Sequence, residues 1–208
     1  MIVAGTVTLP HRLAPGDPDV FAAFDAALAK LGPFETAPRV AVAVSGGPDS
    51  LALVFLTAEW CGARNGQVMA LTVDHKLRPE STPEAAQVAT WMADYGIAHH
   101  ILEWEGPKPE TGIQDAARQA RYHLLTTWCR REGILHLLLG HHADDQAETV
   151  VFLTNRHSGP DGLAGMAAIV ELPQLRLLRP LLGLRHDALL RDLQYRRQDF
   201  LTDPSNIN

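Results

Sequence analysis

The chain has 208 residues, of which 46% are hydrophobic and 20% are charged, and its formal net charge is −6 at pH 7. These values are ordinary for a globular domain with a full core, and the negative charge argues against holding a large nucleic acid by the protein's overall field. Two distant cysteines, Cys61 and Cys129, exclude a disulfide framework and a C-x-x-C metal site. No apolar run is long enough for a membrane span and no signal-peptide pattern opens the chain, so we expect a cytoplasmic protein with no membrane partner.

The first predicted element is a helix that follows a loose lead-in. Residues 1–17 contain two prolines and a glycine and are expected to be flexible, and residues 18–208 are expected to form one domain. Asp17-Pro18 is typical of a helix start, and apolar residues at helical spacing continue to Gly32-Pro33.

Strand and helix patterns then alternate along the chain. We expect strands at 39–44, 68–73, 97–104 and 135–139, and helices at about 49–63, 82–95, 113–132 and 144–154. Alternation with short loops predicts an α/β fold, with a Rossmann-like parallel sheet and helices on both of its faces. Ligands of such sheets bind beyond the carboxyl ends of the strands.

The first strand runs directly into a loop typical of a phosphate site, Ser45-Gly46-Gly47-Pro48-Asp49-Ser50. Such a loop presents backbone N–H groups and the positive end of a helix dipole to an anion, and Gly46 and Gly47 allow close approach of the main chain. It is not a Walker A loop, because no lysine occurs within 45–50. A carboxylate at Asp49 would repel phosphates unless it held Mg²⁺ or a cationic substrate group.

Polar clusters also follow the second and fourth strands, at residues 74–81 and 140–149. The second cluster has paired histidines, His141 and His142, which with its acids could bind a metal, act as acid and base, or hold a cation. A structural zinc site is not favoured, because no further His or Cys ligand lies at helical spacing. Two acids and a threonine of the same cluster lie at positions i, i+3 and i+4 and therefore share one helix face. These residues are Asp145, Glu148 and Thr149.

Arginines at helical spacing suggest phosphate contacts. Gln114, Arg118 and Arg121 lie on one face of the long predicted helix, where the two arginines are plausible phosphate clamps. Two later groups could contact nucleic acid, although the second reads equally well as a solvated helix face; the groups are Arg176, Arg179 and Arg185, and Arg191, Arg196 and Arg197.

Taken together, these stretches resemble the N-type ATP pyrophosphatases, or PP-loop family, and within them the tRNA(Ile)-lysidine synthetases. The resemblance covers residues 38–206 and keeps the family's order and spacing. The matching motifs are Ser45-Gly-Gly-Pro-Asp-Ser50, Val73-Asp-His-x-Leu-Arg-Pro-Glu-Ser81, Ala117-Arg-x-x-Arg-Tyr122, Gly140-His-His-x-Asp-Asp145 with Glu148-Thr149, Gly162-Leu-x-Gly-Met166, Arg179-Pro-Leu-Leu182 and Asp203-Pro-Ser-Asn206.

The resemblance implies an ATP-dependent ligase of the adenine nucleotide alpha hydrolase-like fold. It would adenylate the wobble cytidine of tRNA(Ile) with a CAU anticodon, releasing pyrophosphate, and then attach free L-lysine with release of AMP. Residues 45–50 and Arg118 would bind ATP, Arg121 would stabilise the transferring phosphate, and Asp49 and Asp145 would hold Mg²⁺. Asp49, His141 and Asp145 would orient the lysine ammonium or Mg²⁺, and one of these three would take the proton of the amine. A homodimer remains open.

Two features depart from the family pattern. His157 stands where the family commonly has glycine, and the chain ends at Asn208, where the family continues into tRNA-binding domains. The alternatives are an adenine-nucleotide-binding module without catalysis and a tRNA thiolase. The thiolase alternative is weaker, because Cys61 and Cys129 are too far apart in sequence to form the cysteine pair that thiolases use.

Overall fold

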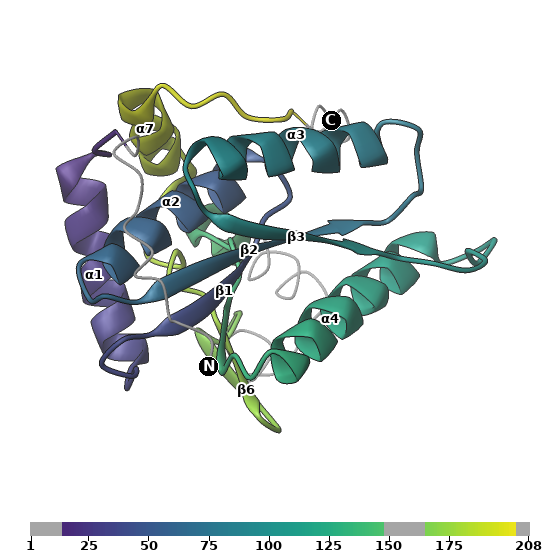
Figure 1. Ribbon diagram of the computed structural model, residues 1–208, viewed down its shortest axis with the longest axis horizontal. Helices are drawn as coiled ribbons and strands as arrows, with labels where there is room; N and C mark the ends of the chain where they lie inside the picture. The colour runs from purple at the N-terminus through teal and green to yellow at the C-terminus, as the bar shows by residue number, and fades with distance from the viewer. Residues whose placement is uncertain (1–13, 148–164, 203–208) are drawn as a thin grey trace, which may run out of the picture.

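The structure is a computed structural model that describes residues 14–147 and 165–202 (Figure 1). Its elements, in chain order, are α1 (Pro18–Leu31), β1 (Arg39–Ala43), α2 (Pro48–Gly62), β2 (Gln67–Asp74), α3 (Ser81–Asp94), β3 (Ala98–Glu103), α4 (Ile113–Arg131), β4 (His136–Leu138), β5 (Ile169–Leu172), β6 (Leu175–Leu178) and α7 (His186–Arg196). Residues 143–147 are also helical. None of the described helices is both long and apolar enough to cross a bilayer.

The strands form one six-stranded sheet in the order β3-β2-β1-β4-β6-β5. All neighbouring pairs are parallel except β5 and β6, which form an antiparallel pair at one edge. Val42 lies at the centre of the sheet, opposite Ala70 on β2 and Leu138 on β4. The predicted parallel α/β sheet is therefore confirmed, and the antiparallel edge strand is an addition to it.

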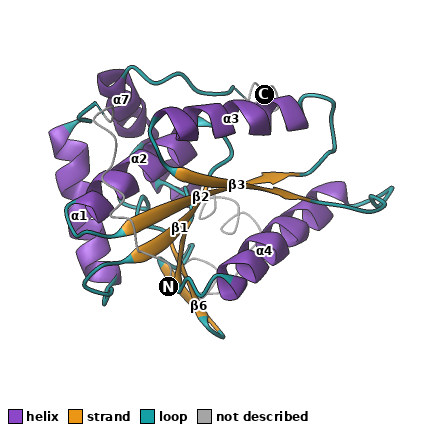
Figure 2. Ribbon diagram, in the orientation of Figure 1, coloured by secondary structure: helices purple, strands orange, loops and turns teal. Residues whose placement is uncertain are grey.

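Helices cover both faces of the sheet, as expected (Figures 1 and 2). α1, α2, α3 and α7 lie over one face and share a single buried apolar cluster, whereas α4 covers the other face through a second cluster with Leu125 and Trp128. α2 is apolar nearly all round because it is enclosed between the sheet and α7, and eleven of its residues are buried.

The observed boundaries follow the predicted ones closely in the first part of the chain. Asp17 caps α1 by accepting a 3.0 Å hydrogen bond from the amide of Asp19. The predicted helix at 144–154 is described only as far as residue 147, so Glu148 and Thr149 lie outside the described residues, as do 1–13 of the expected lead-in, most of the motif at 162–166 and the motif at 203–206. β5, β6 and α7 were not predicted as elements.

Two arginines considered for nucleic-acid contact, one from each later group, have structural roles instead. Arg196 is 3% exposed and pairs with Asp192 at 2.8 Å and with Glu59 at 2.9 Å, while its guanidinium also donates to the carbonyl of Ala14. These bonds join α7 to α2 and to the residues before α1. Arg176 likewise donates to the carbonyls of Leu31, Gly32 and Pro33. The interpretation of these two arginines as nucleic-acid contacts was wrong, and so was the solvated helix face for Arg196, because their donors are used within the fold.

Candidate functional site

The loop between β1 and α2 leaves backbone N–H groups available to a ligand. Ser50 Oγ donates to the carbonyl of Gly47 at 2.9 Å and accepts the amide of Ser45 at 3.1 Å, which closes the loop on itself. Within the described part of the chain, no acceptor meets the amides of Gly46, Gly47, Asp49 and Ser50. Four donors at the start of a helix, with its positive dipole end, form an anion-binding arrangement.

The conformation of Gly46 requires glycine. Its φ is +91°, and a Cβ there would lie 2.5 Å from Leu201 Cδ1 and 2.9 Å from Val88 Cγ2. The carbonyl of Gly46 also accepts a 2.9 Å hydrogen bond from the amide of Leu201, so the segment after α7 is anchored against the loop. Two segments that are distant in sequence, α3 through Val88 and the segment after α7 through Leu201, therefore pack against the loop.

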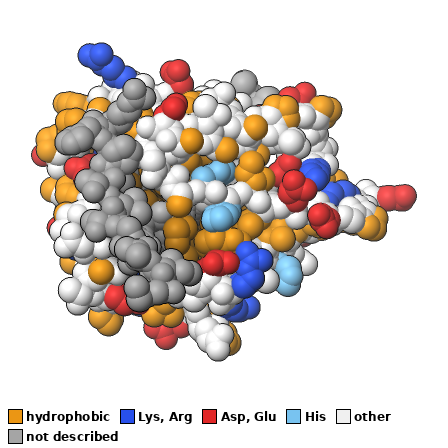
Figure 3. All heavy atoms as spheres, in the orientation of Figure 1, with side chains coloured by type: hydrophobic (Ala, Val, Ile, Leu, Met, Phe, Trp, Pro, Cys, Tyr) orange, Lys and Arg blue, Asp and Glu red, His pale blue; other side chains and the backbone are white. Residues whose placement is uncertain are grey.

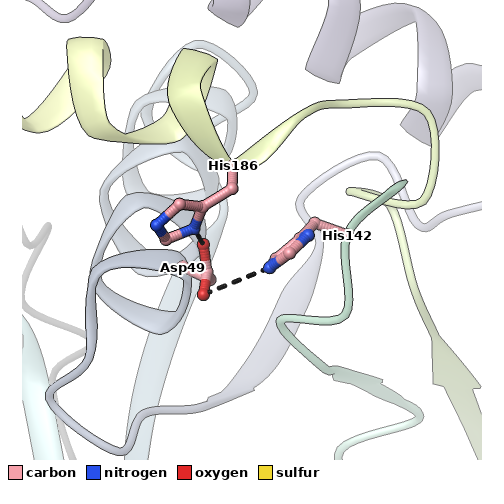
Figure 4. Close-up of side chains that lie close together, drawn as sticks. All are labelled: Asp49, His142 and His186. Atoms are coloured by element: carbon pink, nitrogen blue, oxygen red, sulfur yellow. Dashed lines mark hydrogen bonds and ion pairs between the residues drawn. The ribbon is translucent and has the colours of Figure 1, made fainter. Parts of the chain in front are cut away.

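Asp49, in the first turn of α2, lies between two imidazole rings (Figure 4). Its Oδ1 accepts a 2.7 Å hydrogen bond from Nδ1 of His186 at the start of α7, and its Oδ2 lies 3.5 Å from Nε2 of His142. A Cβ at Gly140 would lie 3.4 Å from the backbone of Ser50, in ordinary van der Waals contact, so the segment after β4 packs directly against the first turn of α2. The carboxyl end of β4 therefore brings its histidine against α2.

The ionisation of Asp49 and His142 is coupled. Burial by itself would raise the pKa of Asp49, but the hydrogen bonds with His142 and His186 outweigh it and hold the pKa below its ordinary value. The pKa of His142 is raised, mainly by the hydrogen bond to Asp49 and against the effect of burial, with further help from the charges of Asp145 and Asp144. Asp49 is accordingly an ionised carboxylate at neutral pH.

Asp144 and Asp145 organise the residues that follow β4. Asp145 accepts the amide of His142 at 2.9 Å, an arrangement that caps the helix at 143–147. Asp144 accepts the amide of His186 at 2.9 Å and so caps α7 from another segment. The two helix starts are thereby joined next to Asp49. Asp145 Oδ2 lies 3.6 Å from Nε2 of His142, which places its carboxylate near the Asp49 carboxylate predicted to share a metal.

A positively charged group lies beside these acids. Nδ1 of His141 accepts a 3.2 Å hydrogen bond from Nε of Arg179. Burial, and then the charges of Arg179, Arg121 and Arg118, lower the pKa of His141 to about 4. The imidazole is thus neutral at pH 7, and because Nδ1 is an acceptor, its proton is on Nε2.

The two predicted phosphate arginines differ in their surroundings. Arg121 is half-buried, and burial lowers its pKa, as does the charge of Arg118. Among the described residues no acidic side chain pairs with it. Arg118 is exposed, and its guanidinium lies 5.6 Å from the ring centre of Tyr122. A half-buried, unneutralised guanidinium favours an anionic ligand.

The cluster after β2 is largely structural. Asp74 is 1% exposed and accepts hydrogen bonds from Ser81 Oγ, from Thr82 Oγ1 at 2.6 Å and from the amide of Lys76 at 2.9 Å. Burial would raise its pKa, but these bonds bring the pKa below its ordinary value. Asp74 therefore holds the loop to the start of α3 and is not presented to a ligand.

The sequence interpretation missed one member of the site and did not single out another. His186 belongs to no motif that was considered, and His142 was noted only as half of a histidine pair. The signal for His142 was its place after a buried strand at the ligand edge. No local signal marks His186, because its partner Asp49 lies 137 residues away. Figure 3 shows histidine side chains near the middle of one face of the molecule, with acidic and basic side chains nearby.

Comparison with known proteins agrees with this geometry. A family model described as the PP-loop domain matches residues 20–208. The chain belongs to the PP-loop family. The predicted family is thus confirmed.

Curated relatives of this PP-loop domain share one name. The chain is 47% identical over 177 residues to the tRNA(Ile)-lysidine synthase of Rhodopseudomonas palustris, covering 84% of this chain and 51% of that protein. It is 45% identical over 176 residues to the protein of the same name from Bradyrhizobium sp., covering 84% and 49%. The chain therefore spans about half the length of the curated relatives it matches.

Solved structures support the PP-loop fold alone. The U34-tRNA thiolase NcsA from Methanococcus maripaludis, determined with its [4Fe-4S] cluster, aligns with a TM-score of 0.75 at 19% identity and covers 90% of this chain and 68% of that chain. The FMN adenylyltransferase of Candida glabrata aligns with a TM-score of 0.51 at 13% identity, covering 88% and 56%.

Proposed function

We propose that this PP-loop domain carries the ATP-dependent chemistry of a tRNA(Ile)-lysidine synthase. In the first step, O2 of the wobble cytidine attacks the α-phosphorus of ATP, and the bond to the bridging oxygen breaks to release pyrophosphate. In the second step, the ε-amine of lysine attacks C2 of the adenylated base, loses a proton, and displaces AMP. The observation that carries the proposal is the similarity of 84% of the chain to proteins of that name.

The loop after β1 supports ATP binding. The amides of Gly46, Gly47, Asp49 and Ser50 would receive the leaving pyrophosphate, whose negative charge grows as the bond breaks. Arg121, half-buried and without an acidic partner among the described residues, would stabilise the same charge, with exposed Arg118 in a lesser role. Pro48 fits the first turn of α2, because its missing N–H is not needed there.

Asp49 and Asp145 are the residues that would hold Mg²⁺. The ion usually takes one or two carboxylates and completes its shell with substrate phosphates and water, which fits two carboxylates beside a phosphate loop. When bound, Mg²⁺ would supply charge neutralisation for the triphosphate. Asp49 is suited to this because it is ionised at neutral pH.

Hydrogen bonds within the site limit which side chain could accept the proton of lysine. His141 is unsuited, because its Nδ1 lone pair is used by Arg179 and its Nε2 carries the proton. It would instead donate a hydrogen bond to a substrate oxygen. The carboxylates of Asp49 and Asp145 would orient the lysine ammonium, and one of the two would take the proton.

The positions of the cysteines argue against the thiolase alternative. Cys61 packs in the apolar cluster on one face of the sheet and Cys129 in the cluster on the other face. Both thiols are free and buried, and burial raises the pKa of each to about 12. Two inert thiols separated by the sheet cannot hold one sulfur or one cluster between them.

The direct experiment incubates the chain with tRNA(Ile), ATP and lysine and analyses the anticodon nucleoside by mass spectrometry. Lysidine in place of cytidine at the wobble position is the expected product, and its formation should stop when ATP or lysine is omitted. The matched control is Asp49→Asn, which keeps the size of the side chain and removes its charge. Unmodified cytidine together with intact ATP binding would favour the nucleotide-binding module, and 2-thiocytidine would favour a thiolase.

A further inference from the structure

Two imidazole nitrogens and one carboxylate oxygen lie close together in the site. Asp49, His142 and His186 each offer one ligand atom, and these three atoms all lie within 4.8 Å of one another (Figure 4). They come from the start of α2, from the segment after β4 and from the start of α7. Hydrogen bonds between these segments, rather than one flexible loop, hold the three donors together.

The spacing of the donors is close to that of a coordination sphere. Zn²⁺ binds imidazole nitrogen and carboxylate oxygen at about 2.0–2.2 Å, which places neighbouring ligand atoms about 3.3 Å apart in a tetrahedral site. In the structure, Asp49 Oδ1 and His186 Nδ1 are 2.7 Å apart, and Asp49 Oδ2 and His142 Nε2 are 3.5 Å apart. Small side-chain rotations would bring one atom of each residue to bonding distance of a single ion.

The surroundings also favour a bound cation. The amide of Asp144 donates a 3.2 Å hydrogen bond to Nδ1 of His142, which fixes the ring with its Nε2 facing Asp49. Asp145 Oδ2 lies 3.6 Å from Nε2 of the same ring. The side chains of Asp49 and His186 are 25% and 40% exposed, so an ion can enter from solvent and water can complete its shell.

We infer that Asp49, His142 and His186 form a binding site for one divalent transition ion of the Zn²⁺ class. Two imidazoles and one carboxylate suit Zn²⁺ and Co²⁺ and do not suit Mg²⁺, which prefers oxygen ligands throughout. Three protein ligands leave a further position for water, as in open zinc sites. The ion would occupy the Asp49 carboxylate, so its binding and the binding of Mg²⁺ at that carboxylate would exclude one another.

The test is a titration of the nucleotide-free chain with Co²⁺ alone, followed by its visible absorption. One equivalent of Co²⁺ should produce the d–d bands of a four- or five-coordinate ion, Zn²⁺ should displace it, and a large excess of Mg²⁺ should not. His186→Ala and His142→Ala should each weaken Co²⁺ binding by at least about tenfold, the loss typical of disturbing a metal site. His186 is the better variant, because its side chain is 40% exposed and its removal leaves the core intact.

The matched control is His123→Ala, an exposed histidine on α4 outside the three-residue site. It should bind Co²⁺ as the unaltered chain does, and circular dichroism should show the same fold for every variant. The inference is overturned if the unaltered chain gives no d–d bands, if His186→Ala binds Co²⁺ equally well, or if Mg²⁺ displaces Co²⁺ at similar concentrations. No nucleotide, tRNA or lysine is present, so such a result leaves the proposed function untouched.

Discussion

Nδ1 of His186 donates a 2.7 Å hydrogen bond to Oδ1 of Asp49, across 137 residues of sequence. The bond connects the first turn of α7 to the first turn of α2, and Asp144 reinforces it by accepting the amide of His186. The second imidazole, that of His142, lies on the other side of the same carboxylate. Asp49 is therefore held as an oriented anion at the edge of the sheet where the phosphate loop lies.

The loss of ATP–pyrophosphate exchange at low pH should depend on His186. The hydrogen bonds with His142 and His186 keep the pKa of Asp49 below its ordinary value, so the carboxylate stays ionised as the pH falls. In His186→Ala one of these bonds is lost and the Asp49 pKa rises. ATP–pyrophosphate exchange should then be lost at a higher pH on the acidic side, while the neutral-pH rate changes less. An acid limb identical to that of the unaltered chain would contradict this assignment.

Arg121 should matter far more than Arg118. Removing a positioned cation from phosphoryl-transfer chemistry costs at least about 10²-fold in rate, and Arg121 is half-buried with no acidic partner among the described residues. Arg121→Ala should lower ATP–pyrophosphate exchange by about that factor or more. Arg118→Ala, at an exposed position against Tyr122, should cost less than about tenfold, because an exposed charge is screened by water. Equal losses in the two variants would refute this difference in roles.

Gly46→Ala should destabilise the fold as well as the loop. An alanine at φ +91° is strained, and its Cβ would collide with Leu201 and Val88, so we expect a loss of about 1–3 kcal/mol in the free energy of unfolding. Gly47→Ala is the matched control: its φ is −71°, and the nearest atom to a new Cβ, Ser45 Oγ, is 3.7 Å away. Its free energy of unfolding in urea should change by less than about 1 kcal/mol.

Breaking the buried ion pair of α7 should lower the free energy of unfolding by a large amount. Arg196→Ala leaves Asp192, which is 0% exposed, without its cation, and removing one partner of a buried pair costs about 3–5 kcal/mol. Arg191, on the same helix, is 54% exposed and pairs weakly with Asp17 at 3.7 Å and with Asp187 at 3.9 Å. Arg191→Ala should therefore cost about 1 kcal/mol or less in the same urea experiment.

Asp74 should contribute stability that is lost in acid. Its pKa is lower in the folded chain than in the unfolded chain, so its contribution is present above the ordinary pKa of 3.8 and disappears as the pH falls through the folded value. Asp74→Asn should cost about 1.5–3 kcal/mol at neutral pH, the worth of hydrogen bonds to a charged group. The difference in unfolding free energy between the two chains should shrink progressively below about pH 4. A constant difference across that range would show that the charge is not involved.

Local patterns predicted the first four strands, the helices around them and the phosphate loop, because each is determined by neighbouring residues. Apolar periodicity marks a buried face within one element, and the Gly46-Gly47 pair marks a turn whatever surrounds it. Parallel topology then followed, since strands separated by helices can pair in only a few ways. The placement of residues 45–50 and 141–145 at one sheet edge was predictable for the same reason, because they follow the paired parallel strands β1 and β4.

What the sequence by itself determined was thus the family, the loop proposed to bind phosphate and the edge of the sheet at which that loop lies. Only the tertiary structure decided that His186 faces Asp49, that Arg196 is buried against Asp192 and Glu59, and that β5 runs antiparallel to β6. The physical reason is the sequence separation of the interacting residues. Periodicity and turn chemistry act over a few residues, whereas two side chains 137 residues apart come into contact only when the core has packed. The chemistry of Asp49 depends on that second kind of contact.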